Sequence, residues 1–392
     1  MKKTLLILVA ATTLTIDAAA QLPSILPAHH PLMDPWYPKV FYGSLEGFTF
    51  GGYYAIIDPI GFADEDFRPP YKWSVSLDGH ASTSGSRQLT LSAQFPAAFT
   101  GWRFGFEMNA QRRAREFYFG IGNNSVFDQA NEQIDEFFYR SKNLVTNIRG
   151  GIQRRILPNL WVLVGFHTER WTVDTLTSTG QLARDAAARP ELRIGVGTND
   201  ISARVGLVFD SRSDEIAPRD GLLIEAIVGR ADSSMMGDLT YTRTTVSARG
   251  YASIGQHWVL AARVMGQNQT GTPAIGSLFM VESGRTRYNG IGGTDHRGLA
   301  DSRLIGPGKL LVNVDVRYDI FPYPSFFPVT LVWFLDAGRV FDQDQFRITA
   351  EGLKIGGGGG VFLQIGRAGI AGITLGAGPD GLHTEFHTAW PF

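Results

Sequence analysis

The stretch Leu382–Phe392, with the sequence LHTEFHTAWPF, gives the clearest indication of the fold. Its even positions carry Leu, Thr, Phe, Thr, Trp and Phe, whereas its odd positions carry His, Glu, His, Ala and Pro. Because successive side chains of a strand point to opposite faces, this alternation predicts one apolar face and one polar face. An apolar outside and a polar inside are typical of a transmembrane β-barrel. We therefore expect Trp390 and Phe392 on the outer face of the strand that closes such a barrel.

Composition favours an exported membrane barrel. The chain has 392 residues, 46 glycines, no cysteine and a formal net charge of -1. Its charged fraction of 19% lies below the roughly 25% of soluble domains, and beyond the first twenty residues no apolar run approaches the ~18 residues of a membrane helix. The lack of cysteine excludes disulfides and thiolate chemistry, and the near-neutral charge gives no basic field for nucleic acid. A secreted soluble all-β protein is the alternative on composition alone.

The chain divides into three parts. Residues 1–20 have the positive start, short apolar core and small-residue cleavage site of an export signal. Residues 21–44 hold five prolines, so we predict an extended periplasmic lead-in without regular structure. Residues 45–392 carry alternating segments near the ~9–11 residues of a tilted membrane strand. We interpret them as one barrel domain.

The fold class predicted for this domain is all-β, a transmembrane antiparallel β-barrel. We count about fifteen or sixteen alternating segments, and the even number typical of bacterial single-chain barrels favours sixteen. The region from Phe117 to Leu157 leaves the count open. Closure of the barrel would leave no backbone group unpaired in lipid.

A long segment without alternation lies between Gly266 and Lys309, and a loop of this length is usually functional or disordered. In the two strands that follow it, Asp315 and Asp336 fall on the lumen-facing side, and a simple hairpin register places them nearly opposite one another. Opposed like charges destabilise a sheet unless a cation lies between them. Arg297, followed by Gly298, can supply that cation. We predict that this late extracellular loop folds into the lumen; the alternative is a surface loop with a solvated arginine.

Four motifs carry a resemblance to a known family. Arg297-Gly298 is similar to the Val/Ile-Arg-Gly-Phe/Tyr loop motif of the bacterial surface antigen superfamily of outer-membrane barrels, which includes BamA and TamA. The segment Phe334–Gly338 matches its Phe-x-Asp-x-Gly strand motif, residues 209–221 resemble its Tyr-Asp-x-Arg…Pro-x-x-Gly hairpin, and residues 356–363 resemble its Gly-rich penultimate region. The order and spacing agree over residues 201–392, and residues 45–200 agree in pattern only.

The resemblance implies sixteen strands with the Arg-Gly loop tucked against the Phe-x-Asp-x-Gly strand. Arg297 would then pair with Asp336, with Asp315 nearby, while Phe334 and Gly338 would serve the strand motif. His296 and Leu299 depart from the family's usual aliphatic and aromatic neighbours of the arginine, so the loop packing is expected to differ.

The resemblance also implies a role in inserting outer-membrane proteins or in moving a polypeptide or lipid through the membrane. We expect a member without POTRA domains in the outer membrane of a Gram-negative bacterium. Its expected partners are outer-membrane lipid, client polypeptides or a separate periplasmic partner, and the barrel assembly machinery during biogenesis, with no nucleic acid. The alternative is a passive pore or structural barrel.

We expect the mechanism at the barrel seam, where a first strand near Leu45–Asp58 meets the last strand. Gly47, Gly51 and Gly52 on one side, and Pro391 on the other, in the strand that carries Trp390 and Phe392, would weaken pairing there.

No catalytic, cofactor-binding or metal site is predicted, and we expect a non-enzymatic protein without cofactors. His383 and His387 share one strand face but lie roughly 13 Å apart, too far to hold one ion. The glycines of residues 356–360 lack the lysine and the following helix of a phosphate loop, and the chain contains no Gly-x-Ser-x-Gly esterase motif.

Overall fold

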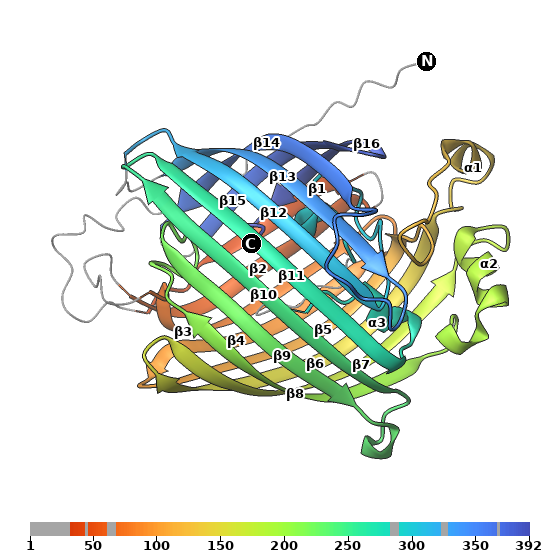
Figure 1. The fold of residues 1–392 in the computed structure, drawn as a ribbon, viewed down its shortest axis with the longest axis horizontal. Helices are drawn as coiled ribbons and strands as arrows, with labels where there is room; N and C mark the ends of the chain where they lie inside the picture. The colour runs from red at the N-terminus through yellow and green to blue at the C-terminus, as the bar shows by residue number, and fades with distance from the viewer. Residues whose placement is uncertain (1–31, 44–45, 61–67, 283–289, 323–327, 367–368) are drawn as a thin grey trace.

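The computed structural model describes residues 32–43, 46–60, 68–282, 290–322, 328–366 and 369–392. The predicted export signal and the first part of the lead-in lie outside these residues. The described chain forms one antiparallel sheet of sixteen strands in which neighbours in sequence are neighbours in space. Figure 1 shows the strands tilted around a barrel. The predicted fold class and strand number are confirmed.

The strands of the sheet have the following bounds: β1 Trp36–Gly43, β2 Gly47–Pro59, β3 Tyr71–Ser82, β4 Arg87–Phe99, β5 Trp102–Phe117, β6 Arg140–Leu157, β7 Leu160–Thr175, β8 Thr198–Asp210, β9 Gly221–Ala231, β10 Thr240–Ile254, β11 Trp258–Thr272, β12 Gly308–Asp319, β13 Val329–Phe341, β14 Lys354–Ile365, β15 Gly369–Gly378 and β16 Gly381–His387. Short helices lie in the connections: α1 Gln129–Ile134, α2 Gln181–Ala188 and α3 Ile275–Phe279. None of the described helices is long and apolar enough to cross a membrane.

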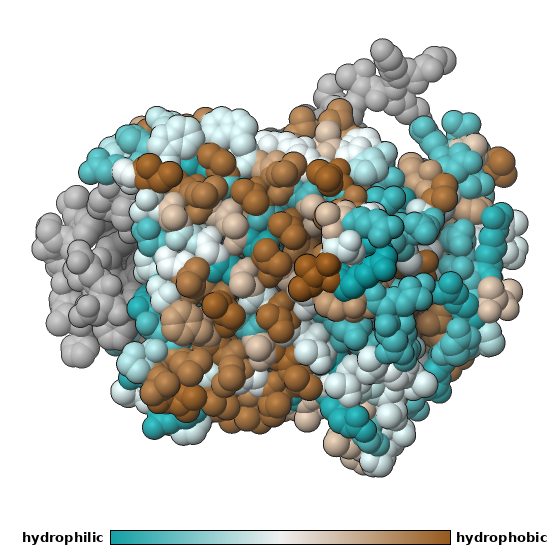
Figure 2. All heavy atoms as spheres, in the orientation of Figure 1, coloured by the Kyte–Doolittle hydropathy of each residue, from teal (hydrophilic) through white to brown (hydrophobic). Residues whose placement is uncertain are grey.

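Alternation along each strand separates an apolar outer face from a more polar lumen. On β11, Leu260 and Val264 are exposed, whereas Arg263 and Gln267 point inward and are buried. Apolar side chains gather over the strands in Figure 2, and the end that carries α1 and α2 is hydrophilic. This is the arrangement that a sheet surrounded by lipid requires.

The two ends of the barrel differ in the length of their connections. One end has tight turns, such as residues 158–159 between β6 and β7, and it also holds the start of β1 and the end of β16. The other end has the long connections 118–139, 176–197 and 273–307. We call these the short-turn end and the long-loop end.

The structure corrects the prediction for the proline-rich lead-in, because its last part forms β1. This strand pairs with β2 along its whole length, from Trp36 opposite Tyr54 to Gly43 opposite Gly47. It is the first strand of the sheet order, and an edge strand tolerates a proline such as Pro38 because its backbone needs hydrogen bonds on one side only.

The same finding corrects the predicted seam glycines. Gly47, Gly51 and Gly52 lie on β2, which is bonded to β1 on one side and to β3 on the other. They therefore lie one strand inside the sheet, and the first strand of the barrel is β1 rather than the segment near Leu45–Asp58.

The structure also corrects the orientation predicted for the last five residues. β16 ends at His387, and the chain then turns into the lumen. The Trp390 ring stacks on Phe362 with 4.3 Å between centroids, and Phe392 is only 6% exposed in a cluster with Tyr251. Large aromatic rings gain as much by packing inside a lumen as by facing lipid, and Pro391 lacks the N–H needed to continue a ladder.

Candidate functional site

Described residues of the connection between β11 and β12 lie inside the barrel. Ile291, Leu299 and Leu304 of this loop are at most 1% exposed and pack with Leu311 and Val340 of the barrel wall. The inward fold predicted for the loop is therefore confirmed. Burial of these apolar side chains stabilises the inward position of the loop, in addition to its polar contacts.

Arg297 binds the two predicted carboxylates. Its backbone N–H and Nε donate to Asp336 Oδ2 at 2.8 and 2.9 Å, and its Nη2 donates to Asp336 Oδ1 at 2.7 Å. The same Nη2 donates to Asp315 Oδ1 at 2.6 Å. All three side chains are 0% exposed, so these charge-assisted bonds are shielded from water.

A second arginine, which was not predicted, balances the charge. Arg317 Nη2 lies 3.1 Å from Asp315 Oδ2, so two arginines face two aspartates. We call Arg297, Asp315, Asp336 and Arg317 the lumen lock. Arg317 shares the lumen-facing side of β12 with Asp315, and this alternation was the sequence signal that could have identified it.

The strand register corrects the relation predicted for the two aspartates. Asp315 pairs with Phe334, and Asp336 pairs with Asn313, so the carboxylates are diagonal rather than nearly opposite. Asn313 Nδ2 donates to Asp336 Oδ1 at 2.7 Å. The register therefore places an amide donor, rather than a like charge, directly opposite Asp336.

The other members of the strand motif have clear physical roles. The Phe334 ring centroid lies 3.8 Å from the Arg297 guanidinium carbon, a cation–π contact. A Cβ added at Gly338 would lie 2.9 Å from Ile291 and 3.3 Å from the His296 ring. Gly338 therefore leaves room for the loop. In this motif Phe334 supplies an aromatic face for Arg297, and Asp336 supplies the carboxylate that binds it.

Glycines of β14 and β15 form the surface on which the loop backbone lies. A Cβ at Gly376 would lie 2.1 Å from the carbonyl oxygen of Arg297, and one at Gly378 would lie 1.9 Å from that of Gly298. Gly298 and Gly356 meet in the same way, with an added Cβ on either less than 3 Å from the Cα of the other. Only bare backbone permits this approach.

His296 and Leu299 fit the loop despite their departure from the family pattern. His296 Nε2–H donates to the backbone oxygen of Lys354 at 2.9 Å, and burial lowers the pKa of the ring. The neutral ring adds no positive charge beside Arg297. Leu299 joins the buried cluster of the loop.

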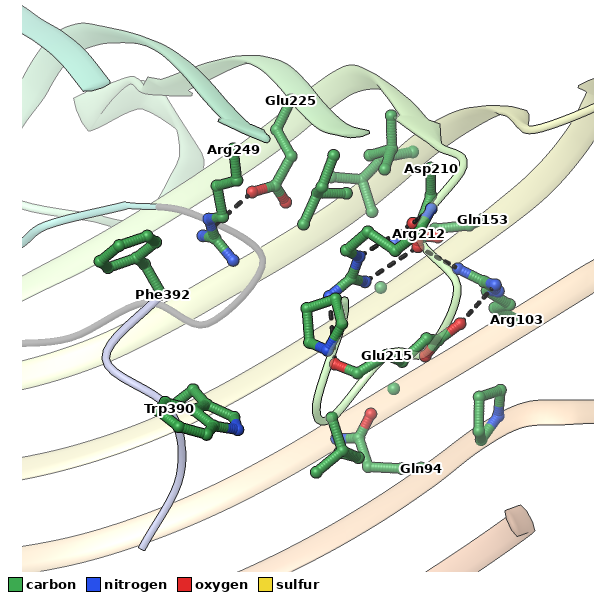
Figure 3. Close-up of a pocket in the computed structure, with 18 of the residues that line it drawn as sticks. Gln94, Arg103, Gln153, Asp210, Arg212, Glu215, Glu225, Arg249, Trp390 and Phe392 are labelled. Atoms are coloured by element: carbon green, nitrogen blue, oxygen red, sulfur yellow. Dashed lines mark hydrogen bonds and ion pairs between the residues drawn. The ribbon is translucent and has the colours of Figure 1, made fainter. Parts of the chain in front are cut away.

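The lumen near the short-turn end contains a cavity of about 640 Å³. Figure 3 shows Trp390 and Phe392 on one side of it and the charged residues of the β8–β9 turn on the other. In that turn Arg212 binds Asp210 with two bonds of 2.9 Å, and Arg103 Nη2 lies 2.6 Å from Glu215 Oε1.

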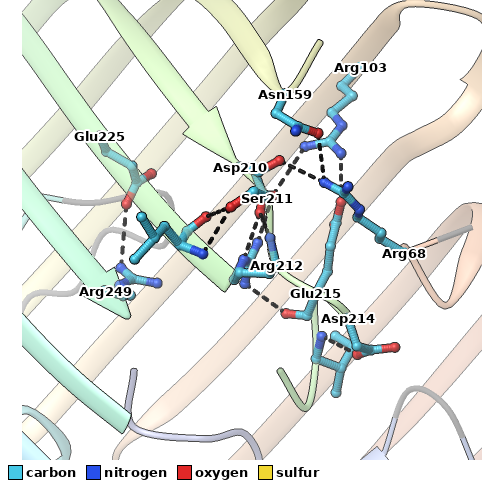
Figure 4. A network of polar contacts seen from close by, with 12 residues as sticks. Arg68, Arg103, Asn159, Asp210, Ser211, Arg212, Asp214, Glu215, Glu225 and Arg249 are labelled. Carbon is cyan, nitrogen blue, oxygen red and sulfur yellow. Dashed lines mark hydrogen bonds and ion pairs between the residues drawn. The ribbon is translucent and has the colours of Figure 1, made fainter. Parts of the chain in front are cut away.

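The β8–β9 turn, which carries the predicted hairpin motif, is tied to neighbouring elements of the barrel. Arg68 Nη1 donates to Asn159 Oδ1 at 2.9 Å and to the backbone oxygen of Asp210 at 2.8 Å (Figure 4). Burial raises the pKa of Glu215, although Arg103 and Arg212 act in the opposite sense.

The seam of the sheet lies between β1 and β16. The ladders of the described residues run from β1 to β16 in order, and none joins these two strands. β16 has only seven residues, because the tail that carries Trp390 and Phe392 has turned inward. Among the described residues, no group of three or more metal-ligating side chains could hold a metal ion.

Sixteen tilted strands around a polar lumen filled by a locked loop define a β-barrel of the outer-membrane type. The model of the Omp85 superfamily domain matches residues 73–375, and the chain belongs to this superfamily. No curated protein gives a significant sequence match.

Several solved structures have a fold similar to that of this chain. BamA from Haemophilus ducreyi lacking POTRA domains 1-3 has a TM-score of 0.55 at 12% identity, over 91% of this chain and 69% of that one. CdiB from Escherichia coli has a TM-score of 0.58 at 12% identity, over 92% and 62%. CdiB from Acinetobacter baumannii has a TM-score of 0.50 at 12% identity, over 91% and 59%. This chain thus spans less than two thirds of either CdiB structure, and the likeness supports the fold alone.

Proposed function

We propose that the protein acts without enzymatic chemistry in the outer membrane, where it inserts membrane proteins or moves a polypeptide or lipid by opening between β1 and β16. The observation that carries the proposal is that, in the part of the chain that the structure describes, no ladder joins the facing edges of β1 and β16. An unpaired edge offers a row of N–H and C=O groups to an incoming strand. Opening there breaks no ladder between described strands, so it costs less than opening anywhere else in the sheet.

The lumen lock supports this proposal by its position. Its wall residues Asp315, Arg317 and Asp336 lie on β12 and β13, and the Arg297–Gly298 backbone of the loop rests on the glycines of β14 and β15. None of these contacts uses β1 or β16. Elsewhere the loop does contact β16, through residues Gly293–Asp295. The lock itself can therefore stay closed while the seam opens.

The orientation of the barrel in the membrane, and the partners at each of its surfaces, can be proposed from its two ends and its outer face. In barrels of this class the short turns face the periplasm and the long loops face outward. Outer-membrane lipid would cover the apolar face. A client polypeptide, or a separate periplasmic partner that delivers it, would approach the cavity at the short-turn end, and the barrel assembly machinery would act in biogenesis of the protein itself.

Reconstitution into liposomes tests the proposal. The rate at which an unfolded client barrel inserts is compared with and without the protein, and we expect faster insertion. Because the chain has no cysteine, pairs of cysteines scanned along β1 and β16 can close the seam by oxidation. Oxidation should abolish the rate gain and reduction should restore it.

The matched control is a cysteine pair at Thr49 and Ser82, which are opposite one another in the β2–β3 ladder. Oxidation of this pair should leave insertion unchanged. The alternative function, a passive pore, is favoured by the cavity of about 640 Å³ at one end of the lumen. Ion conductance without any effect on client insertion would contradict the assembly function and support the pore.

A further inference from the structure

The lumen loop contacts the barrel wall at a second place, near Glu282. This carboxylate is 5% exposed. Its Oε1 lies 3.3 Å from Nη1 of Arg204 on β8, and its Oε2 lies 3.6 Å from Nη1 of Arg243 on β10. The contact lies on a different part of the wall from the lumen lock, which uses β12 and β13.

A third arginine belongs to the same place. Arg149 of β6 lines a void of about 10 Å³ together with Glu282, Arg204 and Arg243. Its Nη2 is buried and has no hydrogen-bond partner among the described residues. Three cationic side chains from alternate strands thus converge on one loop carboxylate.

The wall between Arg204 and Arg243 is bare backbone. Both arginines are opposite Gly229 of β9 in the two ladders that flank it. A Cβ added at Gly229 would lie 3.8 Å from Glu282 Oε2. This distance is an ordinary van der Waals contact, so the carboxylate lies against the backbone between the two guanidinium groups and a Cβ at this position would not displace it.

The backbone of the loop is held so that the carboxylate points to the wall. Gln267 of β11 accepts from the Glu282 N–H at 2.9 Å and donates to the Met280 oxygen at 2.9 Å. Burial by itself raises the pKa of Glu282, but the charges of Arg243, Arg204 and Arg149 outweigh it, and the pKa lies below its ordinary value. The group is therefore anionic at neutral pH.

We propose that Arg149, Arg204 and Arg243 form a carboxylate-binding site on the lumen wall, with Glu282 as its resident ligand. The site reverses the polarity of the lumen lock, in which a loop cation binds wall anions. The remaining void has room for about one water molecule. A free carboxylate can therefore bind only in place of the Glu282 side chain. The site does not depend on opening of the seam.

Chemical rescue tests the site. Glu282→Ala removes a group of the size of acetate, and we expect sodium acetate to raise the melting temperature of the full-length variant saturably, relative to sodium chloride at equal ionic strength. Wild type and Glu282→Gln are the matched controls, because their side chains still fill the space, and acetate should not stabilise them. Adding Arg243→Gln to Glu282→Ala should raise the acetate concentration for half effect about tenfold, as expected for one lost charged partner.

A Glu282→Ala variant that gains no acetate-specific stability would overturn the proposal. If this variant does not fold, a cysteine at Ser277, which is 3% exposed on the same loop, gives a second measurement. If the site holds the loop, a thiol reagent should modify the cysteine of the double variant Ser277→Cys/Glu282→Gln at least about tenfold faster than that of Ser277→Cys alone. The reason is that loss of the Glu282 charge releases this part of the loop from the wall. Equal rates would also overturn the site.

Discussion

The lumen lock and the β1–β16 seam are close in the sheet but differ in how they are held. Arg297 donates four hydrogen bonds to two buried carboxylates, whereas no ladder joins β1 to β16 among the described residues. The lock resists opening because a broken charge pair would stay buried. Separation of β1 from β16 leaves no described charge pair broken and buried. The comparison indicates a barrel in which the charge pairs of the lock lie on β12 and β13, away from the β1–β16 edge, while Arg317 connects the lock to the tail that follows β16.

The largest effect is expected from removal of the lock cation. Arg297→Ala leaves Asp336 and Asp315 buried without their main partner, and we expect a loss of about 3–5 kcal/mol in unfolding free energy. Urea unfolding, followed by heat-modifiable gel mobility, measures this loss. The control is Arg230→Ala, which breaks the more exposed pair with Asp232 and should change the unfolding free energy far less, because water screens that pair. Similar losses for the two variants would contradict the assigned role of Arg297.

A smaller effect is expected from the glycine surface beneath the loop. Gly378→Ala places a Cβ 1.9 Å from the Gly298 carbonyl oxygen, and the loop backbone must move. Overpacking of this kind costs about 1–3 kcal/mol, measured by the same unfolding assay. Gly52→Ala is the control, since its nearest neighbour would be 3.8 Å away. If both substitutions are neutral, the loop does not rest on this surface.

The tail beside the seam should be less costly to disturb than the lock. Trp390→Ala removes the stack on Phe362 and the contact with the Arg317 guanidinium, whose carbon lies 3.9 Å from the Trp390 ring. We expect a loss of about 1–2 kcal/mol from these two contacts, together with faster proteolysis of the C-terminus. Unchanged proteolysis would indicate that the tail is not held in the lumen by Trp390.

The smallest expected effect is the coupling between lock and tail. Arg317 binds Asp315 of the lock and also stacks on Trp390, so it links the two regions. A double-mutant cycle of Arg297→Ala with Trp390→Ala should give a coupling of about 0.5–1 kcal/mol. Arg317→Lys, which keeps the charge but loses the planar face, should reduce this coupling toward zero. A coupling that survives in Arg317→Lys must pass through other residues.

The sequence predicted which distant residues form the lock, but it did not predict how they are arranged relative to one another. The inward positions of Asp315 and Asp336 followed from strand alternation. Charge balance made Arg297 a candidate partner, and the resemblance of the loop motif favoured this pairing over a solvated surface arginine. The diagonal register, with Asn313 opposite Asp336, depends on where the hairpin turns, which alternation alone does not determine. The inward turn of Trp390 and Phe392 was missed because alternation does not distinguish aromatic rings that face lipid from rings that pack in a lumen.

The sequence by itself determined the all-β class and the residues that face the lumen, because strand alternation leaves a period-two signal along the chain. It favoured sixteen strands over fifteen only through the even number typical of such barrels, and it favoured the inward loop through the motifs of the resemblance. Only the tertiary structure decided which strands are edges and where the tail lies. It alone brought Arg149, Arg204 and Arg243 to one carboxylate. These contacts join residues from distant strands, and their geometry exists only once the register and curvature of the whole barrel are set.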